Sequence, residues 1–148
     1  MQEVYPVSAG TRESAEMGGA ITARQIDRDP ERKYAVYTEI TVYVLAMPDV
    51  IVDEIIDHVG IELGEDRDYV QPRVSELIAL DVLTKSMRKK PSLRYGRSSS
   101  VHIPSEALLD HVQAMKPTSE GDLRIIVRGF VQSRIIAIRS ARRLSRRG

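Results

Sequence analysis

The sequence predicts a mainly α-helical fold with one small β-hairpin. Three segments between residues 31 and 80 carry apolar residues at helical spacing, and the alternating pattern of strands follows in residues 83–103. Helical spacing then returns in residues 121–148. Three short helices followed by a hairpin are typical of a winged helix-turn-helix. We therefore expect this domain at residues 31–104 and a C-terminal helical, Arg-rich extension at residues 105–148.

The length and composition fit one ordinary domain. At 148 residues the chain can bury a core, which Leu, Ile and Val must fill because only seven aromatic side chains are present. The absence of cysteine excludes a disulfide framework and a thiolate metal site. There is no signal-like beginning and no apolar run of about 18 residues, so we expect a soluble, cytoplasmic protein without membrane contact.

We expect residues 1–30 to form an N-terminal tail that precedes the winged domain. They are rich in Gly, Ser, Thr and Glu, and we expect in them at most one short helix around residues 12–17. The first helix of the domain follows at residues 31–47 and ends at Met47 because Pro48 disfavours helical backbone before it. Its apolar positions are Ala35, Val36, Tyr37, Ile40, Tyr43, Val44 and Leu45.

Two shorter helices are expected next. The first begins after Asp49, a suitable cap, and ends at Gly60. The second runs over residues 68–80, with Pro72 in its first turn, because a proline further inside would remove a helix hydrogen bond. The apolar residues that share a face are Val50, Ile51, Ile55, Ile56 and Val59 in the first helix, and Val70, Val74, Leu77 and Ile78 in the second.

A hairpin is predicted from two alternating runs, residues 83–87 and 98–103. The polar connection between them is too long for a tight turn. Ser105 is then expected to cap a further helix, which ends at Lys116 before a proline.

The last segment, residues 121–148, predicts an amphipathic helix, although its Ile and Val content leaves a strand as an alternative. A lone helix would expose its apolar side, so we expect it to pack on the winged domain or to form a homodimer. The apolar side carries Leu123, Ile126, Val127, Phe130, Val131 and Ile138, and the opposite side carries Arg124, Arg128, Arg139, Arg142, Arg143 and Arg146.

Charge is strongly segregated along the chain. The net charge is only +1, yet residues 1–83 hold 17 acidic side chains against 7 basic ones. Residues 84–97 hold 6 basic side chains and residues 123–148 hold 8, and neither segment contains an acid. Two basic segments on an otherwise acidic chain can neutralise phosphates of a nucleic acid, whereas a solvated loop is the simpler alternative for residues 84–97.

These features together predict an interface for double-stranded DNA. In a helix-turn-helix the second helix enters the major groove, and a wing can meet the neighbouring backbone. Gln71 can read adenine, Arg73 a guanine or a phosphate, and Ser75 either kind of group. The helix residues expected to face away from the core are Asp68, Tyr69, Pro72, Ser75, Glu76 and Ala79, with Gln71 and Arg73 at the flanks. The wing residues expected on phosphates are Lys85, Arg88, Lys89, Lys90, Arg94 and Arg97.

Several segments resemble a known family. GTRESAEM near the start, VQPRVSEL in the third helix and KKPSLRYGRSSSVHI in the wing look like the small MarR-like winged-helix proteins of phage and prophage genomes. The resemblance covers about residues 10–103 and implies a DNA-binding protein of phage gene control or replication. The residues that match its helix and wing motifs are Pro72, Arg73, Glu76, Leu77, Gly96 and Arg97.

Two departures from the family pattern, and the acids that come with one of them, keep a second interpretation open. Asp81 stands where these proteins usually have a turn glycine, and the connection before the third helix is longer and acidic. Acids there repel phosphates unless they face elsewhere or cap the helix. The alternative is a winged helix that binds protein within a phage or host assembly, and RNA is a third class of partner. The acids concerned are Glu62, Glu65, Asp66 and Asp68.

The end of the chain, RSARRLSRR, is a further candidate interface. It can bind a nucleic-acid backbone, or it can cover the acidic surface of a protein partner, including a second copy of this chain. Its basic residues are Arg139, Arg142, Arg143, Arg146 and Arg147.

Catalysis is not predicted. His58, His102 and His111 fall in different segments, and no metalloprotease, phosphate-loop or nucleophile-elbow motif is present. We expect His58 to be an exposed residue near a helix end, and we expect no cofactor and no metal site.

Overall fold

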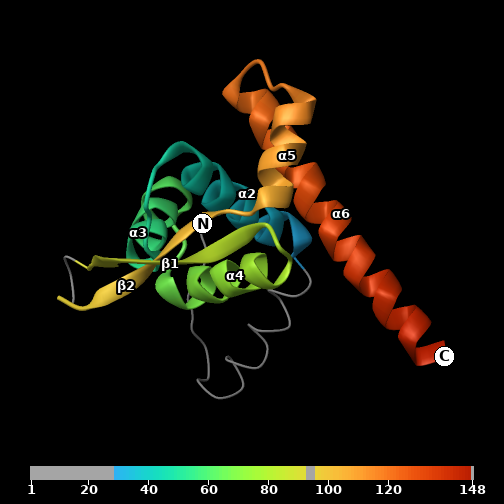
Figure 1. Ribbon diagram of the computed structural model, residues 1–148, viewed down its shortest axis with the longest axis horizontal. Coiled ribbons are helices and arrows are strands. Elements are labelled where there is room, and N and C mark those ends of the chain that lie inside the picture. The colour runs from blue at the N-terminus through green and yellow to red at the C-terminus, as the bar shows by residue number, and fades with distance from the viewer. Residues whose placement is uncertain (1–28, 93–95, 148) are drawn as a thin grey trace, which may run out of the picture. The chain divides into compact units, whose positions relative to one another are not determined.

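The computed structural model describes residues 29–92 and 96–147 (Figure 1). The short helix predicted at residues 12–17 lies outside these ranges. The chain divides into two units, residues 1–33 and residues 34–148. The described part of the first unit is the beginning of helix α2, and the other elements belong to the second unit.

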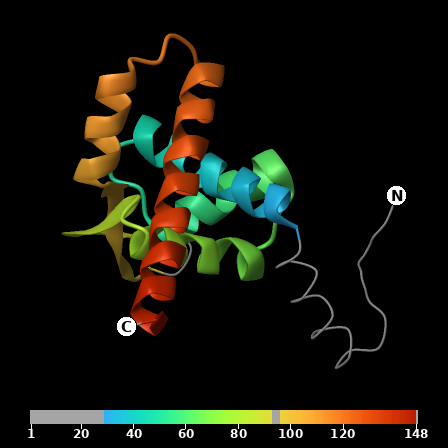
Figure 2. The same ribbon diagram turned by 90° about the vertical axis from the view of Figure 1, so that its right-hand side faces the viewer.

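The element order is that of a winged helix-turn-helix, which confirms the predicted fold class. Within residues 29–92 and 96–147, three helices precede an antiparallel hairpin and two helices follow it (Figures 1 and 2). The described fold is mainly α with one small hairpin. Its elements are α2 (Pro30–Ala46), α3 (Val52–Leu63), α4 (Arg67–Ala79), β1 (Leu83–Pro91), β2 (Ser98–Pro104), α5 (Glu106–Met115) and α6 (Glu120–Arg147).

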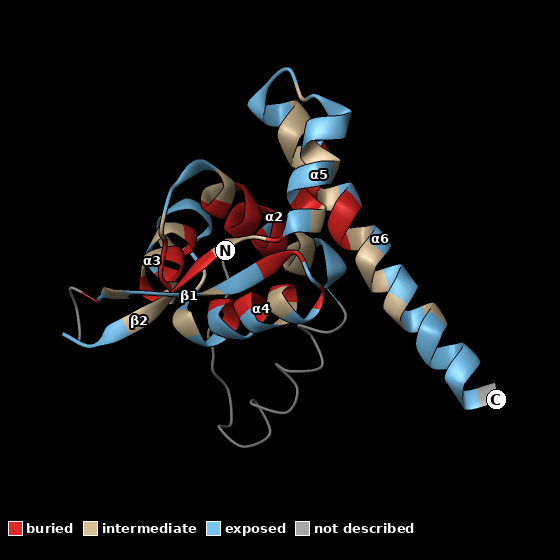
Figure 3. Ribbon diagram, viewed as in Figure 1, coloured by how far each residue is buried: buried red, intermediate tan, exposed pale blue. Residues whose placement is uncertain are grey.

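The core lies where α2, α3 and α4 meet the base of the hairpin (Figure 3). Ile40 of α2, Ile55 of α3 and Leu77 of α4 are fully buried, and so is Val82 just before β1. Close packing of this kind resists deformation, so it fixes α4 and the hairpin relative to each other.

Helix α3 starts and ends later than predicted. Asp49 does not cap it, because Asp49 has a φ of 56° and Ile51 is the residue before the helix. The Ile51 N–H donates to the Glu54 carboxylate at 3.1 Å. Gly60 lies inside the helix, whereas Gly64, with a φ of 71°, ends it and donates its N–H to the Gly60 carbonyl. Two glycines fitted the pattern, and only the second adopts the left-handed conformation.

Helix α4 is confirmed, with small differences at its start. Asp66 caps it, and its carboxylate accepts a hydrogen bond from the Tyr69 N–H at 3.0 Å. Because the helix begins at Arg67, Pro72 lies in the second turn rather than the first. The Asp68 carbonyl therefore loses its usual helix partner, at a position where both residues are exposed.

Helix α4 ends in a Schellman turn that holds Asp81 at the position favoured by glycine. The Val82 N–H donates to the Leu77 carbonyl at 2.9 Å, and the Asp81 N–H donates to the Ile78 carbonyl at 3.1 Å. Asp81 is left-handed, with a φ of 60°. Aspartate tolerates this conformation better than most side chains do, so the turn is kept without the glycine.

The hairpin strands are longer than predicted and their connection is shorter. Strand β1 continues to Pro91, and the Gly96 N–H donates to the Ser92 carbonyl at 2.9 Å within the turn. The strand register shifts between Lys85 and Lys89. An irregularity at this place interrupts the alternation of side chains, which explains why the sequence pattern stopped at residue 87.

The two C-terminal helices lie where the sequence places them. Ser105 caps α5 by accepting a hydrogen bond from the Leu108 N–H at 3.0 Å, and Lys116 ends it with a φ of 51°. Residues 120–147 form one helix, so the strand alternative is wrong. Within the described residues, no helix combines the length and apolar character that crossing a membrane requires. The predicted apolar residues of α6 that are buried are Ile126, Val127, Phe130 and Val131.

Candidate nucleic-acid interface

The outer side of α4 is polar and uncharged except for one acid. Gln71 and Ser75 are exposed there, as base-reading residues must be. The other exposed residues of the helix are Asp68, Pro72 and Ala79. Attraction to a phosphate backbone must therefore come from other elements.

Arg73 does not lie on that outer side, which corrects its expected exposure. Arg73 is only 9% exposed, and its Nη2 donates to Glu76 Oε2 at 3.0 Å while its Nε lies 2.9 Å from Glu76 Oε1. Its guanidinium covers the ring of Tyr69 at 4.8 Å. Tyr69, also expected to be exposed, is 5% exposed.

The cluster around Arg73 joins α4 to α2. The Tyr37 hydroxyl donates to Glu76 Oε1 at 2.6 Å, and burial together with this hydrogen bond raises the pKa of Tyr37. Arg73 follows Val70 by three residues and precedes Leu77 by four, so it belongs to the buried face by spacing alone. The sequence pattern places Arg73 at the flank of the outward side, and the structure turns it toward the core instead.

The wing carries both free and paired cations. Arg88 pairs with Asp49, with 2.5 Å between Nη1 and Oδ1, and Lys90 Nζ lies 3.0 Å from Glu54 Oε1. Lys90 also donates to the Asp49 carbonyl at 2.9 Å. Arg94 lies outside the described residues. The predicted wing contacts that are exposed and have no ion-pair partner in residues 29–92 and 96–147 are Lys85, Lys89 and Arg97.

The wing is attached to α3 and to the segment just before it. Asp53, which is 8% exposed, accepts hydrogen bonds from the Ser92 hydroxyl at 2.8 Å and from Arg67 Nη2 at 2.7 Å. The His102 N–H of β2 donates to the Val50 carbonyl at 2.7 Å. Burial lowers the pKa of His102, which keeps its ring neutral at neutral pH. These contacts restrain the wing beside α4.

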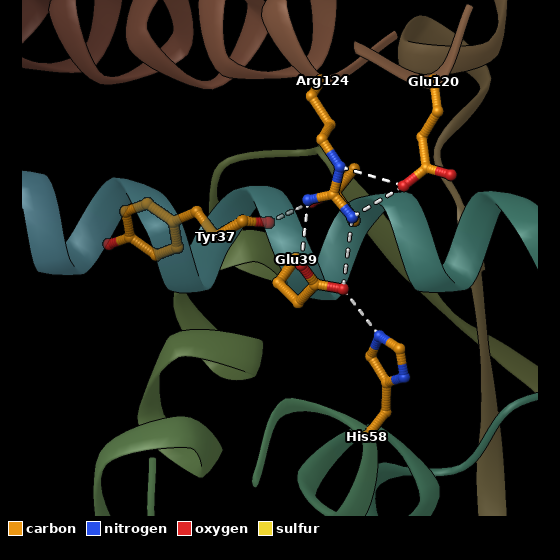
Figure 4. A network of polar contacts seen from close by, with 6 residues as sticks. Tyr37, Glu39, His58, Glu120 and Arg124 are labelled. Atoms are coloured by element: carbon orange, nitrogen blue, oxygen red, sulfur yellow. Dashed lines mark hydrogen bonds and ion pairs between the residues drawn. The ribbon is translucent and has the colours of Figure 1, made fainter. Parts of the chain in front are cut away.

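Helix α6 is attached to the winged domain through a buried acid that the sequence pattern did not predict (Figure 4). Glu39 of α2 is 5% exposed, with its Oε1 2.9 Å from Arg124 Nη1 and its Oε2 2.7 Å from His58 Nε2. Burial opposes ionisation of Glu39, but hydrogen bonds and charges from Arg124 and His58 outweigh it and lower the pKa. Glu39 follows Val36 by three residues and precedes Tyr43 by four, and this spacing within the apolar pattern of α2 is the signal that could have revealed it.

A second contact fixes α6 beside the end of α4. Arg134 Nε donates to the Leu80 carbonyl at 2.8 Å, and Arg134 Nη2 lies 3.5 Å from Asp81 Oδ2. Beyond this contact no residue from 135 to 146 is buried. The last three turns of α6 therefore extend past the core.

Those last turns carry a second group of cations. None of the four arginines described there has an ion-pair partner in the part of the chain that the structure covers. The side chain of Arg147, the fifth predicted contact, lies outside the described side chains. The exposed residues are Arg139, Arg142, Arg143 and Arg146.

The histidines come from three different elements. His58 contacts Glu39 and stacks on Tyr43 with ring centroids 4.1 Å apart, so its predicted exposed position is wrong. His102 lies in β2 and His111 in α5. Among the described residues, no three His, Cys, Asp or Glu side chains gather as a metal-ligand set.

Comparisons with known proteins yield one structural similarity. No protein-family model matches the chain, and no curated protein matches it. A crystal structure titled as an uncharacterized SlyA-like transcription regulator from Listeria monocytogenes is similar, with 12% sequence identity. The match covers 86% of this chain and 96% of that chain, with a TM-score of 0.35. At so low a score, the winged-helix assignment depends on the element order and strand pairing of this chain.

Proposed function

We propose that the protein is a sequence-specific regulator of transcription that binds double-stranded DNA. In this proposal α4 enters the major groove, where Gln71 and Ser75 face base edges. Lys85, Lys89 and Arg97 of the wing contact phosphates. The observation that carries the proposal is the pairing, on one domain, of an exposed helix side that carries Gln71 and Ser75 with three wing cations that have no ion-pair partner among the described residues.

The remaining basic residues have different roles in this scheme. Arg88 and Lys90 contribute less to phosphate binding, because a phosphate must compete with Asp49 and Glu54 for them. Arg73 supports α4 from inside instead of reading a base, since its guanidinium is held by Glu76. Sequence reading is thereby left mainly to Gln71 and Ser75.

The acids near the start of α4 are compatible with this binding mode. Asp66 uses its carboxylate to cap the helix, and Asp68 lies in the first turn. Acids in these places stabilise the positive end of the helix dipole, so both have a local structural role.

We further propose that two copies associate through the outer side of α6. Ile125, Ile136 and Leu144 are 72%, 61% and 69% exposed. A helix end without buried residues is marginal in water on its own, so a second copy would stabilise the extended turns. A two-fold symmetric dimer would also present two α4 helices to the two halves of a symmetric DNA site.

The phage or prophage setting is a narrower proposal. It depends on the resemblance of GTRESAEM, VQPRVSEL and KKPSLRYGRSSSVHI to winged-helix proteins of such genomes. Control of transcription and control of replication are both consistent with that resemblance.

Protein binding is the second candidate function. It is favoured by the acidic surface that leads into α4, where Glu62, Asp66 and Asp68 are exposed, and by the lack of an exposed cation on α4 itself. A winged helix with this surface suits a basic protein partner within a larger assembly.

Selection from a random duplex pool tests the proposed function. Repeated capture by the purified full-length chain should enrich one sequence motif, and Gln71→Ala should enrich a relaxed version of it. Recovery of an unchanged pool by folded protein would favour the protein-binding alternative.

A further inference from the structure

The four described arginines near the end of α6 form a continuous stripe. Their spacing of three, four and seven residues places them on one side of the helix. All are exposed, and no acid occurs after residue 122. We call this surface the arginine stripe, and it consists of Arg139, Arg142, Arg143 and Arg146.

The structure fixes where the stripe lies relative to α4. Arg134 contacts Leu80 and Asp81 directly after α4, and the stripe begins five residues further along the same helix. At about 1.5 Å per residue, it lies roughly 8 to 18 Å beyond that contact. The tip of the wing and the C-terminal end of α6 lie at opposite ends of α4 (Figure 1). A polyanion placed along α4 would therefore meet cations at both ends.

The composition of the stripe favours phosphate over an apolar partner. Arginine presents a planar fork that matches phosphate oxygens, and the four side chains span about 10 Å of helix. That length corresponds to about three phosphates along one strand of B-DNA. Leu144 lies on a neighbouring side of the helix, whereas Ile136 precedes Arg139 by three residues and Arg143 by seven and therefore borders the stripe.

An acidic surface of a second copy is the competing occupant. The exposed acids Glu62, Asp66 and Asp68 lie at the N-terminal end of α4, whereas the stripe follows the contact at its C-terminal end. Within one copy these two surfaces are therefore separated by the length of α4. A phosphate backbone that runs along α4 can contact the stripe without an acidic surface from a second copy.

We propose that the arginine stripe is a second contact for the backbone of duplex DNA, at the end of α4 opposite the tip of the wing. The proposal rests on the proposed function, because it places DNA along α4. The stripe would add to affinity without adding to base recognition, since phosphate contacts carry no sequence information directly.

The test compares three forms of the full-length chain on a specific duplex and a random duplex, at salt concentrations from about 50 to 200 mM. The first is wild type, and the second replaces all four arginines with glutamine. The third replaces them with lysine, which keeps the charge and the cationic helix end. Sedimentation and thermal unfolding of each form accompany the binding curves. A milder variant, Arg142→Gln with Arg146→Gln, serves if the fourfold glutamine variant does not fold.

The glutamine variant should lose at least ~10-fold in affinity for both duplexes, and its salt slope should fall by roughly 0.9 for each phosphate that is no longer neutralised. The lysine variant should keep most of the slope. Unchanged binding and slope in the glutamine variant, with DNA binding by wild type, would overturn the stripe proposal alone. A change in association state without a change in DNA binding would overturn it in favour of a second copy. Failure of wild type to bind any duplex would remove the proposed function and the stripe together.

Discussion

The carboxylate of Glu39 and the guanidinium of Arg124 meet at 2.9 Å, although 85 positions separate them in the chain. This contact joins α2 to α6, and His58 of α3 completes it from the other side. The charged group at the centre is buried, and the surrounding hydrogen bonds compensate for its lost hydration. The C-terminal helix is therefore attached to the winged domain by a specific polar contact as well as by apolar packing.

Removal of Arg124 should destabilise the fold. Arg124→Met leaves a buried carboxylate with only His58 as partner, and we expect a loss of ~1–3 kcal/mol in the free energy of unfolding. The loss should stay below that of a fully buried pair, because the Arg124 side chain is 35% exposed. Urea unfolding measures it, with Arg139→Met as an exposed control. Equal stability of the two variants would show that the contact contributes nothing.

Acid should weaken the fold partly through Glu39. Its pKa is lowered in the folded state, so its contribution to stability is present above the ordinary value of about 4.3 and is lost as the pH falls through the folded value. Below about pH 4, wild type should lose stability more steeply than Glu39→Gln. Unfolding curves at a series of pH values from neutral downward measure this difference. Parallel pH profiles for the two proteins would contradict the assignment.

The fold could be predicted from the sequence because its apolar pattern is regular. Helical spacing marked α2, α4 and α6, and a serine marked the start of α5. The position of Asp81 shows a limit of this approach. The proteins that the sequence resembles usually have glycine there, and only the backbone shows that aspartate takes the same left-handed turn. The sequence pattern likewise gave no reason to choose Gly64 over Gly60 as the residue that ends α3.

The interface was less predictable because charge does not reveal exposure. Arg73 has the charge and the hydrogen-bond donors of a base-reading residue. However, it is buried, where it donates to Glu76, which also accepts a hydrogen bond from Tyr37. Arg88 and Lys90 belong to a basic run, but their partners Asp49 and Glu54 come from more than 30 positions earlier. Pairings over such separations depend on tertiary structure, and no local pattern encodes them.

Substitution of Arg73 should lower the stability of the fold, whereas substitution of Gln71 should lower base recognition. Arg73→Ala leaves Glu76 with only the Tyr37 hydroxyl as partner and should cost ~1–3 kcal/mol of unfolding free energy. Gln71→Ala should leave stability within ~0.5 kcal/mol, because its side chain is exposed. On a specific duplex Gln71→Ala should lose ~1–3 kcal/mol of binding, with much less loss on random DNA. If Arg73→Ala keeps its stability but no longer distinguishes the specific duplex from random DNA, Arg73 rather than Gln71 reads the base.

Association of two copies should depend on the outer side of α6. Ile136→Ser with Leu144→Ser should convert a dimer into a monomer, since both residues are exposed in the single chain. Met87→Ser is a matched control, because Met87 on the wing is 97% exposed and lies outside this helix. Sedimentation at several concentrations measures the change. A wild type that is already monomeric, or a double variant that stays dimeric, would contradict this interface.

The salt dependence of duplex binding tests the central claim most directly. Affinity of the full-length chain should fall steeply between about 50 and 200 mM salt, because released counterions drive phosphate binding. Lys85→Ala with Lys89→Ala should weaken specific and random duplexes about equally and reduce the salt slope by roughly two, one for each lysine removed from a phosphate. Arg67, paired with Asp53, offers the control variant Arg67→Gln, whose slope should stay near that of wild type. Folded protein that binds no duplex at about 50 mM salt, or a slope that the two wing lysines do not affect, would contradict the account.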